Sequence, residues 1–462
     1  MIYSELRFLL FFGLVFLVHW SLRSAKLRKV WLLVASYAFY AGWDWRFLSL
    51  ILFSTGVDYL AGSAIAKAPK ENRLRRKTWL GISLTVNLGL LGFFKYYNFF
   101  VESAADFSSW LGFPVSDMTL GIILPVGISF YTFQTLSYTL DIYRGKMGST
   151  KSLLDFALFV GFFPQLIAGP IVRAIDFLPQ LETPRLFSRV DVRAALLVFL
   201  FGFVKKTCVA DNLSVAVDLV WKAPEAFNLA SHWLAGALYS VQLYCDFSGY
   251  SDMALGTAAL LGYHLPVNFT FPYMRRSLTD LWRSWHITMT GWFRDYIYIP
   301  IGGNRGGKLF TARNTFIVFA VTGIWHGAAW TFIVWGLLHG VLVIIESRTI
   351  GSDGKGRGIW GLIYANVLWI LTFTIFRAPD LGAAGSFLLG YVTPGGDQTL
   401  GLPWLLLLIG FAAVHAWMFS GKLDQGLRRL PAPTFALVYG AMVALALPWA
   451  AGDVQPFIYF QF

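Results

Sequence analysis

Two histidines carry the clearest prospect of chemistry in this sequence. His326 lies between two glycines, flanked by Trp325 and Trp330, inside an apolar run from Phe316 to Ile345. Burying an ionisable group at membrane depth is costly, so such residues are rare and mark functional sites. A neutral imidazole can take a proton from a hydroxyl near physiological pH, which suits a general base. The alternative is a structural histidine that only bonds a neighbouring helix.

A second histidine belongs to a predicted amphipathic helix over residues 278–296. Thr279, Arg283, His286, Thr290 and Arg294 follow one another at spacings of four, three, four and four, which predicts a single polar stripe. By itself this pattern favours an interfacial helix with its basic side in water. The sharper alternative is a cavity wall on which the histidine and both arginines face an anionic ligand. The stripe lies on the flank of an apolar face, which is predicted from residues that recur at three and four: Leu278, Leu281, Trp282, Trp285, Met289, Trp292, Phe293 and Tyr296.

Other motifs favour no further chemistry. Asp246 and Asp252 lie in a Gly/Ser-containing stretch, residues 245–252, where two carboxylates could bind a metal. We favour a helix cap there, because no calcium-type oxygen pattern follows. The Gly-rich basic loop 300–308 lacks the Gly-Lys-Ser/Thr ending of a nucleotide-binding loop. The chain also lacks a G-x-S-x-G elbow and an H-E-x-x-H zinc motif, so we expect neither a serine acyl-enzyme nor a bound metal.

Composition defines the class of protein that must position these residues. Of 462 residues, 56% are hydrophobic and only 13% are charged, against roughly 25% in soluble domains. This predicts an all-α, polytopic integral membrane protein lying in a lipid bilayer. The net charge of +12 comes from short basic loops beside apolar runs, so it indicates cytoplasmic loops and argues against nucleic-acid binding. The same rule places the N-terminus on the extracytoplasmic side.

The apolar runs predict about eleven transmembrane helices and one or two partial, re-entrant or interfacial segments in one domain, residues 1–462. The first four spans are expected at 6–20, 30–40, 47–65 and 79–100. Span 120–140 contains Pro125 and many polar residues, Gln134 among them, so it should face protein or a wet cavity. Segment 153–168 is short and broken by Pro164, as re-entrant segments are. Residues 228–244 and 253–261 are expected to be separate apolar segments.

The position of His326 follows from helix geometry. From Arg313 at the cytoplasmic end, thirteen residues of helix cover roughly 20 Å, which puts His326 near the bilayer centre. In a continuous helix Thr322 and Trp330 share its face, one turn on either side. Gly323 and Gly327 permit the close approach of another helix or a substrate. His339 would lie on roughly the opposite face and is interpreted as structural.

Five ordered motifs resemble the membrane-bound O-acyltransferase family, most of all its bacterial alginate O-acetyltransferase branch and next its teichoic-acid D-alanyl transferase branch. The resemblance implies a ring of helices around a thinned centre with a catalytic tunnel. It also implies that His326 is the catalytic histidine and His286 its companion. The motifs are Leu124–Gln134, Phe163–Pro170, Cys245–Asp252, Leu281–His286 and Gly323–Gly327.

The resemblance further implies an enzyme of a bacterial inner membrane. It would transfer an acyl group, most simply acetyl, from a cytoplasmic thioester such as acetyl-CoA to an extracytoplasmic polysaccharide such as alginate. Transfer would be direct or through a periplasmic SGNH-type acetyltransferase or modification complex, with no resident cofactor. D-alanyl transfer to teichoic acid and a transporter or flippase for an anionic or lipid-linked solute are the alternatives. Expected substrate-binding residues are Gln134, Arg283, Arg294, Thr322, Trp325 and Trp330.

Overall fold

The computed structural model describes residues 3–113, 116, 118–167, 169–351 and 354–450. Within these ranges the chain forms helices and no β-strand; one isolated β-bridge joins Phe227 and Gln398. The expected all-α class is confirmed. The chain divides into two compact units, Met1–Val190 with Ala258–Pro266, and Asp191–Thr257 with Val267–Phe462.

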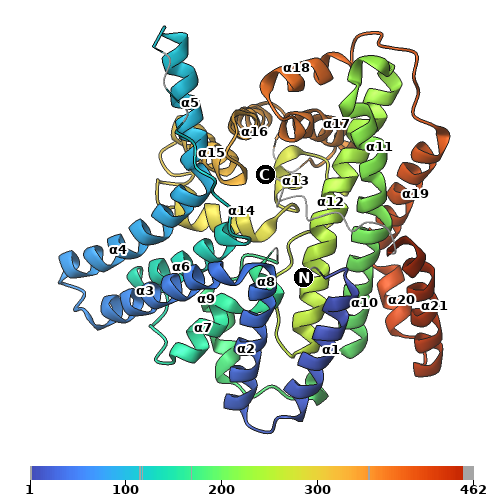
Figure 1. The fold of residues 1–462 in the computed structure, drawn as a ribbon. Coiled ribbons are helices and arrows are strands. Elements are labelled where there is room, and N and C mark those ends of the chain that lie inside the picture. Colours follow the sequence, from blue (N-terminus) through green and yellow to red (C-terminus); the bar gives the residue numbers. More distant parts are fainter. Residues whose placement is uncertain (1–2, 114–115, 117, 168, 352–353, 451–462) are drawn as a thin grey trace. The chain divides into compact units, whose positions relative to one another are not determined.

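The first unit is built from long helices followed by short ones. Side-chain caps start several of them: the Ser24 hydroxyl accepts from Leu27 N–H before α2, and the Asn72 amide oxygen accepts from Arg75 N–H before α4. The helices are α1 (Leu6–Ser21), α2 (Ala25–Asp44), α3 (Leu48–Lys67), α4 (Arg73–Leu91), α5 (Tyr97–Trp110), α6 (Ile128–Tyr143), α7 (Leu153–Gly161), α8 (Phe163–Leu166) and α9 (Ala174–Glu182) (Figure 1).

Proline and glycine shape this unit as expected, with one correction. The predicted span 120–140 is helical only from Ile128, because the residues around Pro125 are irregular and Gly127, at φ 77°, begins the helix. A Cβ on Gly127 would collide with the carbonyl oxygen of Leu166, so the α6 start packs directly on α8. The nine-residue α7 is about 13 Å long, too short to cross a bilayer, in agreement with the predicted broken segment.

A buried polar cluster holds α3, α4 and α6 together. Asp58 on α3 accepts hydrogen bonds from Ser83 Oγ at 2.5 Å and Asn87 Nδ2 at 2.8 Å, both on α4. Asn87 Oδ1 in turn accepts from Thr135 of α6, and Ser83 lies 3.0 Å from Thr139. The polar side chains of α6 therefore face protein, as their composition predicted.

The second unit contains helices of very different lengths. A π-helical segment, Val204–Ala210, connects the first two. The helices are α10 (Val192–Phe203), α11 (Asp211–Lys222), α12 (Leu229–Leu260), α13 (Leu278–Trp282), α14 (Ile287–Phe293), α15 (Lys308–His326), α16 (Trp330–Thr349), α17 (Gly358–Arg377), α18 (Leu381–Leu389), α19 (Leu402–Phe419), α20 (Lys422–Arg428) and α21 (Ala432–Ala450).

The stretch 245–252 is neither a cap nor a turn, so the favoured interpretation as a helix cap was wrong. It lies inside α12, which runs unbroken for 32 residues and joins the two segments expected to be separate. Asp246 forms an ion pair with Lys206 at 2.6 Å, and Asp252 with Lys205 at 2.5 Å. Each carboxylate therefore neutralises a lysine of the π-helical segment. Among the described residues no group of three metal-ligating side chains occurs.

Six continuous helical stretches in the described chain are long and apolar enough to cross a membrane, and Leu6–Ser21 is a shorter apolar helix. The protein is therefore a multi-pass membrane protein. The predicted count of about eleven spans is not confirmed, and one domain over residues 1–462 stays a prediction. The longest stretches, Ala25–Lys67 and Arg73–Trp110, contain more than one helix each.

Candidate active site

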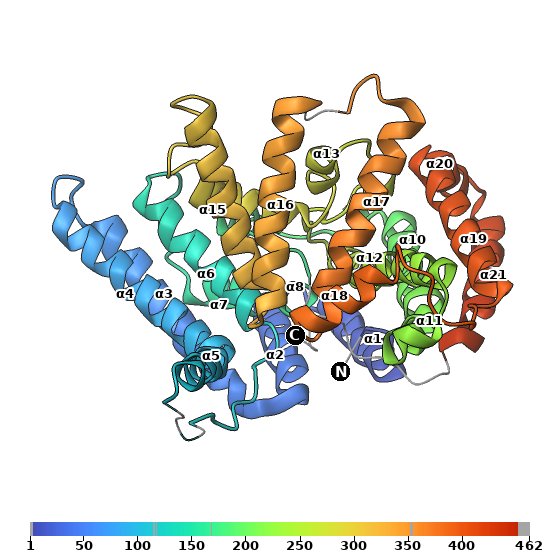
Figure 2. The same ribbon diagram turned by 90° about the horizontal axis from the view of Figure 1, so that it is seen from above.

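His326 ends a helix instead of lying inside one. α15 stops at His326, Gly327 is extended at φ −163° and ψ 160°, and α16 begins at Trp330. The two helices form a tight hairpin and lie side by side in Figure 2. A Cβ on Gly336 of α16 would come within 2.9 Å of the Gly323 Cα, which confirms the predicted close approach at Gly323. The continuous helix was wrong, and so was the shared face for Trp330, which is 55% exposed.

Aromatic rings enclose His326. The histidine is 3% exposed, and its ring centroid lies 5.0 Å from that of Trp325, 5.1 Å from Trp335 on α16 and 5.4 Å from Phe376 on α17. Such rings exclude water from the surroundings of the imidazole. A proton acceptor held in a dry, rigid setting is suited to one defined transfer.

His286 is also buried, but not on the predicted stripe. Segment 278–296 is broken into α13, a turn and α14, and His286 caps α14 with a left-handed backbone at φ 44°. Arg283 and Arg294 are exposed, whereas the His286 side chain is fully buried. The single stripe was therefore wrong because the break rotates the histidine inward. The apolar face was right: all eight of its predicted residues are buried.

One indole connects the two histidines. The Trp325 ring centroid lies 5.8 Å from His286 and 5.0 Å from His326. Phe247 of α12 packs edge-on against His286 at 4.7 Å, and Phe293 of α14 lies 6.2 Å from Trp325. Residues 40 positions apart in the sequence thus meet around Trp325, one of the expected site residues.

A narrow cavity approaches Thr322, one helical turn before His326. Its volume is about 170 Å³, and α14 and α15 supply most of its walls. Thr322 donates its hydroxyl to the Val318 carbonyl at 2.8 Å, and Arg294 forms a 2.7 Å ion pair with Asp295. The hydrogen bond and charge of Asp295 raise the pKa of Arg294, so this guanidinium stays charged. The lining residues are Trp282, Met289, Thr290, Phe293, Arg294, Tyr298, Thr315, Val318, Phe319 and Thr322, without Arg283.

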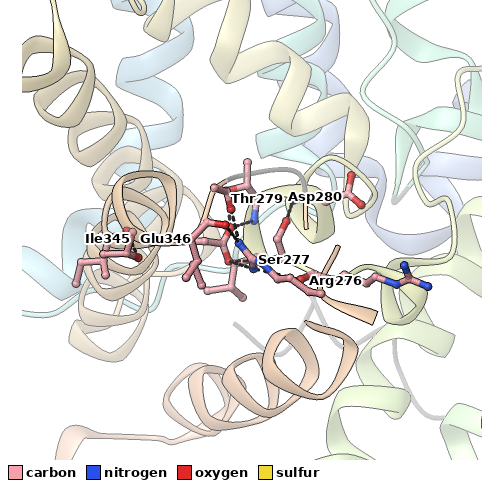
Figure 3. Close-up of polar contacts among 11 residues, drawn as sticks. Arg276, Ser277, Thr279, Asp280, Ile345 and Glu346 are labelled. Carbon is pink, nitrogen blue, oxygen red and sulfur yellow. Dashed lines mark hydrogen bonds and ion pairs between the residues drawn. The ribbon is translucent and has the colours of Figure 1, made fainter. Parts of the chain in front are cut away.

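Two residues of α16 hold α13 in place. The fully buried Glu346 accepts from Leu278 N–H at 2.8 Å, Thr279 N–H at 3.0 Å and the Thr279 hydroxyl at 2.8 Å (Figure 3). His339 Nδ1 accepts a 3.3 Å hydrogen bond from the Trp282 indole, which gives this histidine a structural contact, as interpreted. Sequence reasoning missed Glu346. The available signal was that Glu346 is an isolated acidic residue directly after the apolar run 316–345 and outside any basic loop.

Gln134 occupies α6 of the first unit. Its side chain is fully buried, and neither its Oε1 nor its Nε2 has a hydrogen-bond partner among the described residues. A buried amide without partners costs free energy unless a ligand or water satisfies it. Its assignment to substrate stays a prediction.

Comparison with known proteins identifies the family of this chain. The profile of the membrane-bound O-acyltransferase family matches residues 144–351, which include both histidines. The chain is 36% identical to the probable alginate O-acetylase AlgI of Pseudomonas putida, across 100% of both proteins. It is 36% identical to the peptidoglycan O-acetyltransferase of Helicobacter pylori, across 80% of this chain and 74% of that protein. The teichoic acid D-alanyltransferase of Streptococcus thermophilus is 28% identical, across 53% of this chain and 64% of that protein. The chain belongs to the membrane-bound O-acyltransferase family and is an acyltransferase.

Proposed function

We propose that this enzyme transfers an acetyl group from a cytoplasmic thioester to a hydroxyl of an extracytoplasmic polysaccharide, with alginate as the first candidate acceptor. The observation that carries the proposal is the buried His326 at the end of α15, beside a cavity that begins one turn away at Thr322. The names of the relatives at 36% identity favour O-acetylation over D-alanylation.

His326 serves as general base in this proposal. Its imidazole takes the hydroxyl proton while the acceptor oxygen attacks the thioester carbonyl carbon. A C–O bond forms, the C–S bond breaks, and the imidazolium returns the proton to the departing thiolate. The aromatic rings of Trp325, Trp335 and Phe376, which pack against His326, restrict the orientation of the imidazole and exclude water that would hydrolyse the thioester.

The cavity beside Thr322 is the proposed site of the donor arm. Its walls are mostly apolar, with Trp282, Phe293 and Phe319 among them, while Arg294 and Thr290 supply polar groups. The slender pantetheine arm of coenzyme A suits such a cavity, and a permanently charged guanidinium suits the phosphates of the coenzyme. Arg283 lies outside the lining, so we assign the phosphate contact to Arg294 alone.

The remaining site residues take lesser roles. Trp325 fixes the spacing of the two histidines, and His286 orients His326 or stabilises the oxyanion. Gln134 is proposed to bind a polar group of a substrate, since its buried amide has no hydrogen-bond partner among the described residues. Trp330 is exposed at the start of α16, so we place it at the rim. The inner membrane, an extracytoplasmic N-terminus and a periplasmic SGNH-type partner complete the proposal.

Acetyl transfer in lipid nanodiscs tests the assignment. Purified protein receives labelled acetyl-CoA with alginate oligomers or, in a parallel arm, peptidoglycan fragments, and both thiol release and labelled sugar are measured. His326→Gln should lower turnover at least 100-fold, since base catalysis is typically worth 10²–10⁴-fold. The matched control is His264→Gln, which replaces an exposed histidine and should leave turnover unchanged.

The two readouts separate the parts of the proposal. Full turnover in a folded His326→Gln protein would overturn the base assignment. Labelled peptidoglycan with unlabelled alginate would replace the acceptor and keep the chemistry. A third outcome is thiol release without labelled sugar. If adding an SGNH-type acetyltransferase then produces labelled sugar, transfer through a partner would be established.

A further inference from the structure

His286 is held in a conformation that ordinary residues avoid. Its backbone has φ 44° and ψ 51°, one of only two positive-φ residues other than glycine in the described chain. A left-handed conformation costs a residue with a Cβ roughly 1–2 kcal/mol, so it persists only where neighbours enforce it. Asn268 enforces this conformation. Its backbone carbonyl oxygen accepts a hydrogen bond at 2.9 Å from the backbone N–H of Ile287, the residue that follows His286.

The Asn268 side chain is itself fixed by its surroundings. It is 1% exposed, and its Oδ1 accepts from the Thr288 hydroxyl at 2.7 Å and from Thr288 N–H at 3.4 Å. A backbone N–H only donates, so the side-chain atom facing it must be the amide oxygen. The amide nitrogen then points to Ser251 of α12, with Nδ2 3.2 Å from Oγ.

This orientation decides the tautomer of His286. The Nδ1 atom of His286 lies 3.2 Å from the same Asn268 Oδ1. An amide oxygen has no hydrogen to give, so Nδ1 must carry the hydrogen of the bond. A neutral imidazole with hydrogen on Nδ1 has its lone pair on Nε2. The rings of Phe247 and Trp325, which pack against His286, are uncharged, and the titratable His326 contacts the same Trp325 ring.

We infer that Asn268 is a positioning residue, which holds His286 in the Nδ1–H tautomer and so presents Nε2 as a hydrogen-bond acceptor to the substrate or to His326. The inference rests on the proposed role of His286 in orienting His326, and not on oxyanion stabilisation, because a lone pair on Nε2 cannot donate a hydrogen bond to an oxyanion. The Asn268 side-chain amide can hold this tautomer because it carries no charge. An aspartate at this position would favour the imidazolium, which has no acceptor at Nε2.

Substitution by aspartate separates positioning from simple packing. Asn268→Asp keeps the acceptor and the shape but adds a negative charge beside Nδ1. The charge stabilises the imidazolium, so the acidic limb of the kcat/KM pH profile should move upward by about one unit or more. Turnover should then recover at high pH. Asn268→Ala should lower kcat roughly 10–100-fold at every pH with little change in KM, as loss of an orienting partner does elsewhere.

Thr288→Val is the matched control. This substitution removes the Thr288 hydroxyl that donates to Asn268 Oδ1 but leaves the contact between Asn268 and the His286 imidazole. The pH profile of kcat/KM should therefore stay that of the wild type. An Asn268→Asp profile with an unshifted acidic limb would overturn the inference. If the Asn268→Asp limb is unshifted and His286→Ala is inactive in the same assay, the inference fails but the proposed role of His286 stands. Full turnover in His286→Ala would overturn the inference together with the proposed role of His286.

A spectroscopic readout needs no folded Asn268 variant. In ¹⁵N-histidine-labelled protein in nanodiscs, one neutral imidazole should carry its hydrogen on Nδ1, and His286→Gln should remove that signal. A signal with hydrogen on Nε2 that disappears in His286→Gln would refute the tautomer directly.

Discussion

The carboxylate of Glu346 provides a demanding test of how the site is held. It is fully buried, and three donors of residues 278 and 279 point at it within 3.0 Å. The Arg357 guanidinium forms a distant ion pair with this carboxylate, at 3.9 Å. We expect Glu346→Ala to release the start of α13 and, through it, the backbone turn at His286.

The magnitude follows from the three contacts. Hydrogen bonds to a charged group contribute about 1.5–3 kcal/mol each, and each buried donor left without a partner costs about 1–3 kcal/mol. These overlap, so we expect Glu346→Ala to cost about 3–5 kcal/mol, as removal of one partner of a buried charged pair does. Glu346→Gln keeps one acceptor oxygen but turns a donor towards another N–H, so its cost should be intermediate.

Thermal unfolding and turnover measure this together. At about 2 °C per kcal/mol for a unit of this size, Glu346→Ala should lower the melting temperature in detergent by roughly 6–10 °C. Glu346→Gln should fall between it and the wild type. The control is Asp424→Ala, which removes an exposed i,i+4 pair with Arg428 and should shift stability by less than 1 kcal/mol. A Glu346→Ala protein with unchanged melting temperature and turnover would refute the reasoning.

Two further changes probe the hairpin and the cavity. Gly323→Ala places a Cβ against the Phe332 carbonyl, so α15 and α16 must separate and turnover in acetyl transfer should fall. Gly410→Ala is the control, because its Cβ would lie in open space on α19 and should leave turnover unchanged. Equal activity of the two variants would contradict the packing argument. Arg294→Ala should raise KM for acetyl-CoA about 10-fold or more by losing a charge-assisted contact, yet leave acetyl-pantetheine, which lacks the phosphates, unaffected. Arg283→Ala, outside the cavity, serves as its control, and a KM change shared by both donors would count against a phosphate contact.

Much of the fold follows from local pattern. The first two helices, Leu6–Ser21 and Ala25–Asp44, enclose the apolar runs from which they were predicted, and the third, Leu48–Lys67, begins within one residue of its predicted start, because length and hydrophobicity decide such elements. Breaks at Pro125 and Pro164 were also predictable, since proline removes a backbone donor wherever it occurs. These features depend on residues adjacent in sequence.

The α12 interior was not predictable on the same basis. Glycine, serine and two aspartates over residues 245–252 resemble a turn by composition. They continue a helix because Lys205 and Lys206, some 40 residues earlier, neutralise both carboxylates. Gly249 also lets α12 pack closely on the segment Val204–Ala210, since a Cβ at this position would come within 2.9 Å of the backbone nitrogen of Lys206. A tertiary partner thus overrides local preference.

The candidate site shows the same division between composition and tertiary contact. Burial of His326 follows from its apolar run, but its end position in α15 depends on Gly327 and on the packing of α16. A helical wheel assumes constant rotation per residue, so it cannot place His286, whose backbone reverses at φ 44°. That reversal costs free energy locally and is sustained by Asn268 and Thr288, which the wheel does not include. A sequence pattern can therefore nominate both histidines, whereas their meeting at Trp325 depends on the strained turn that places one of them.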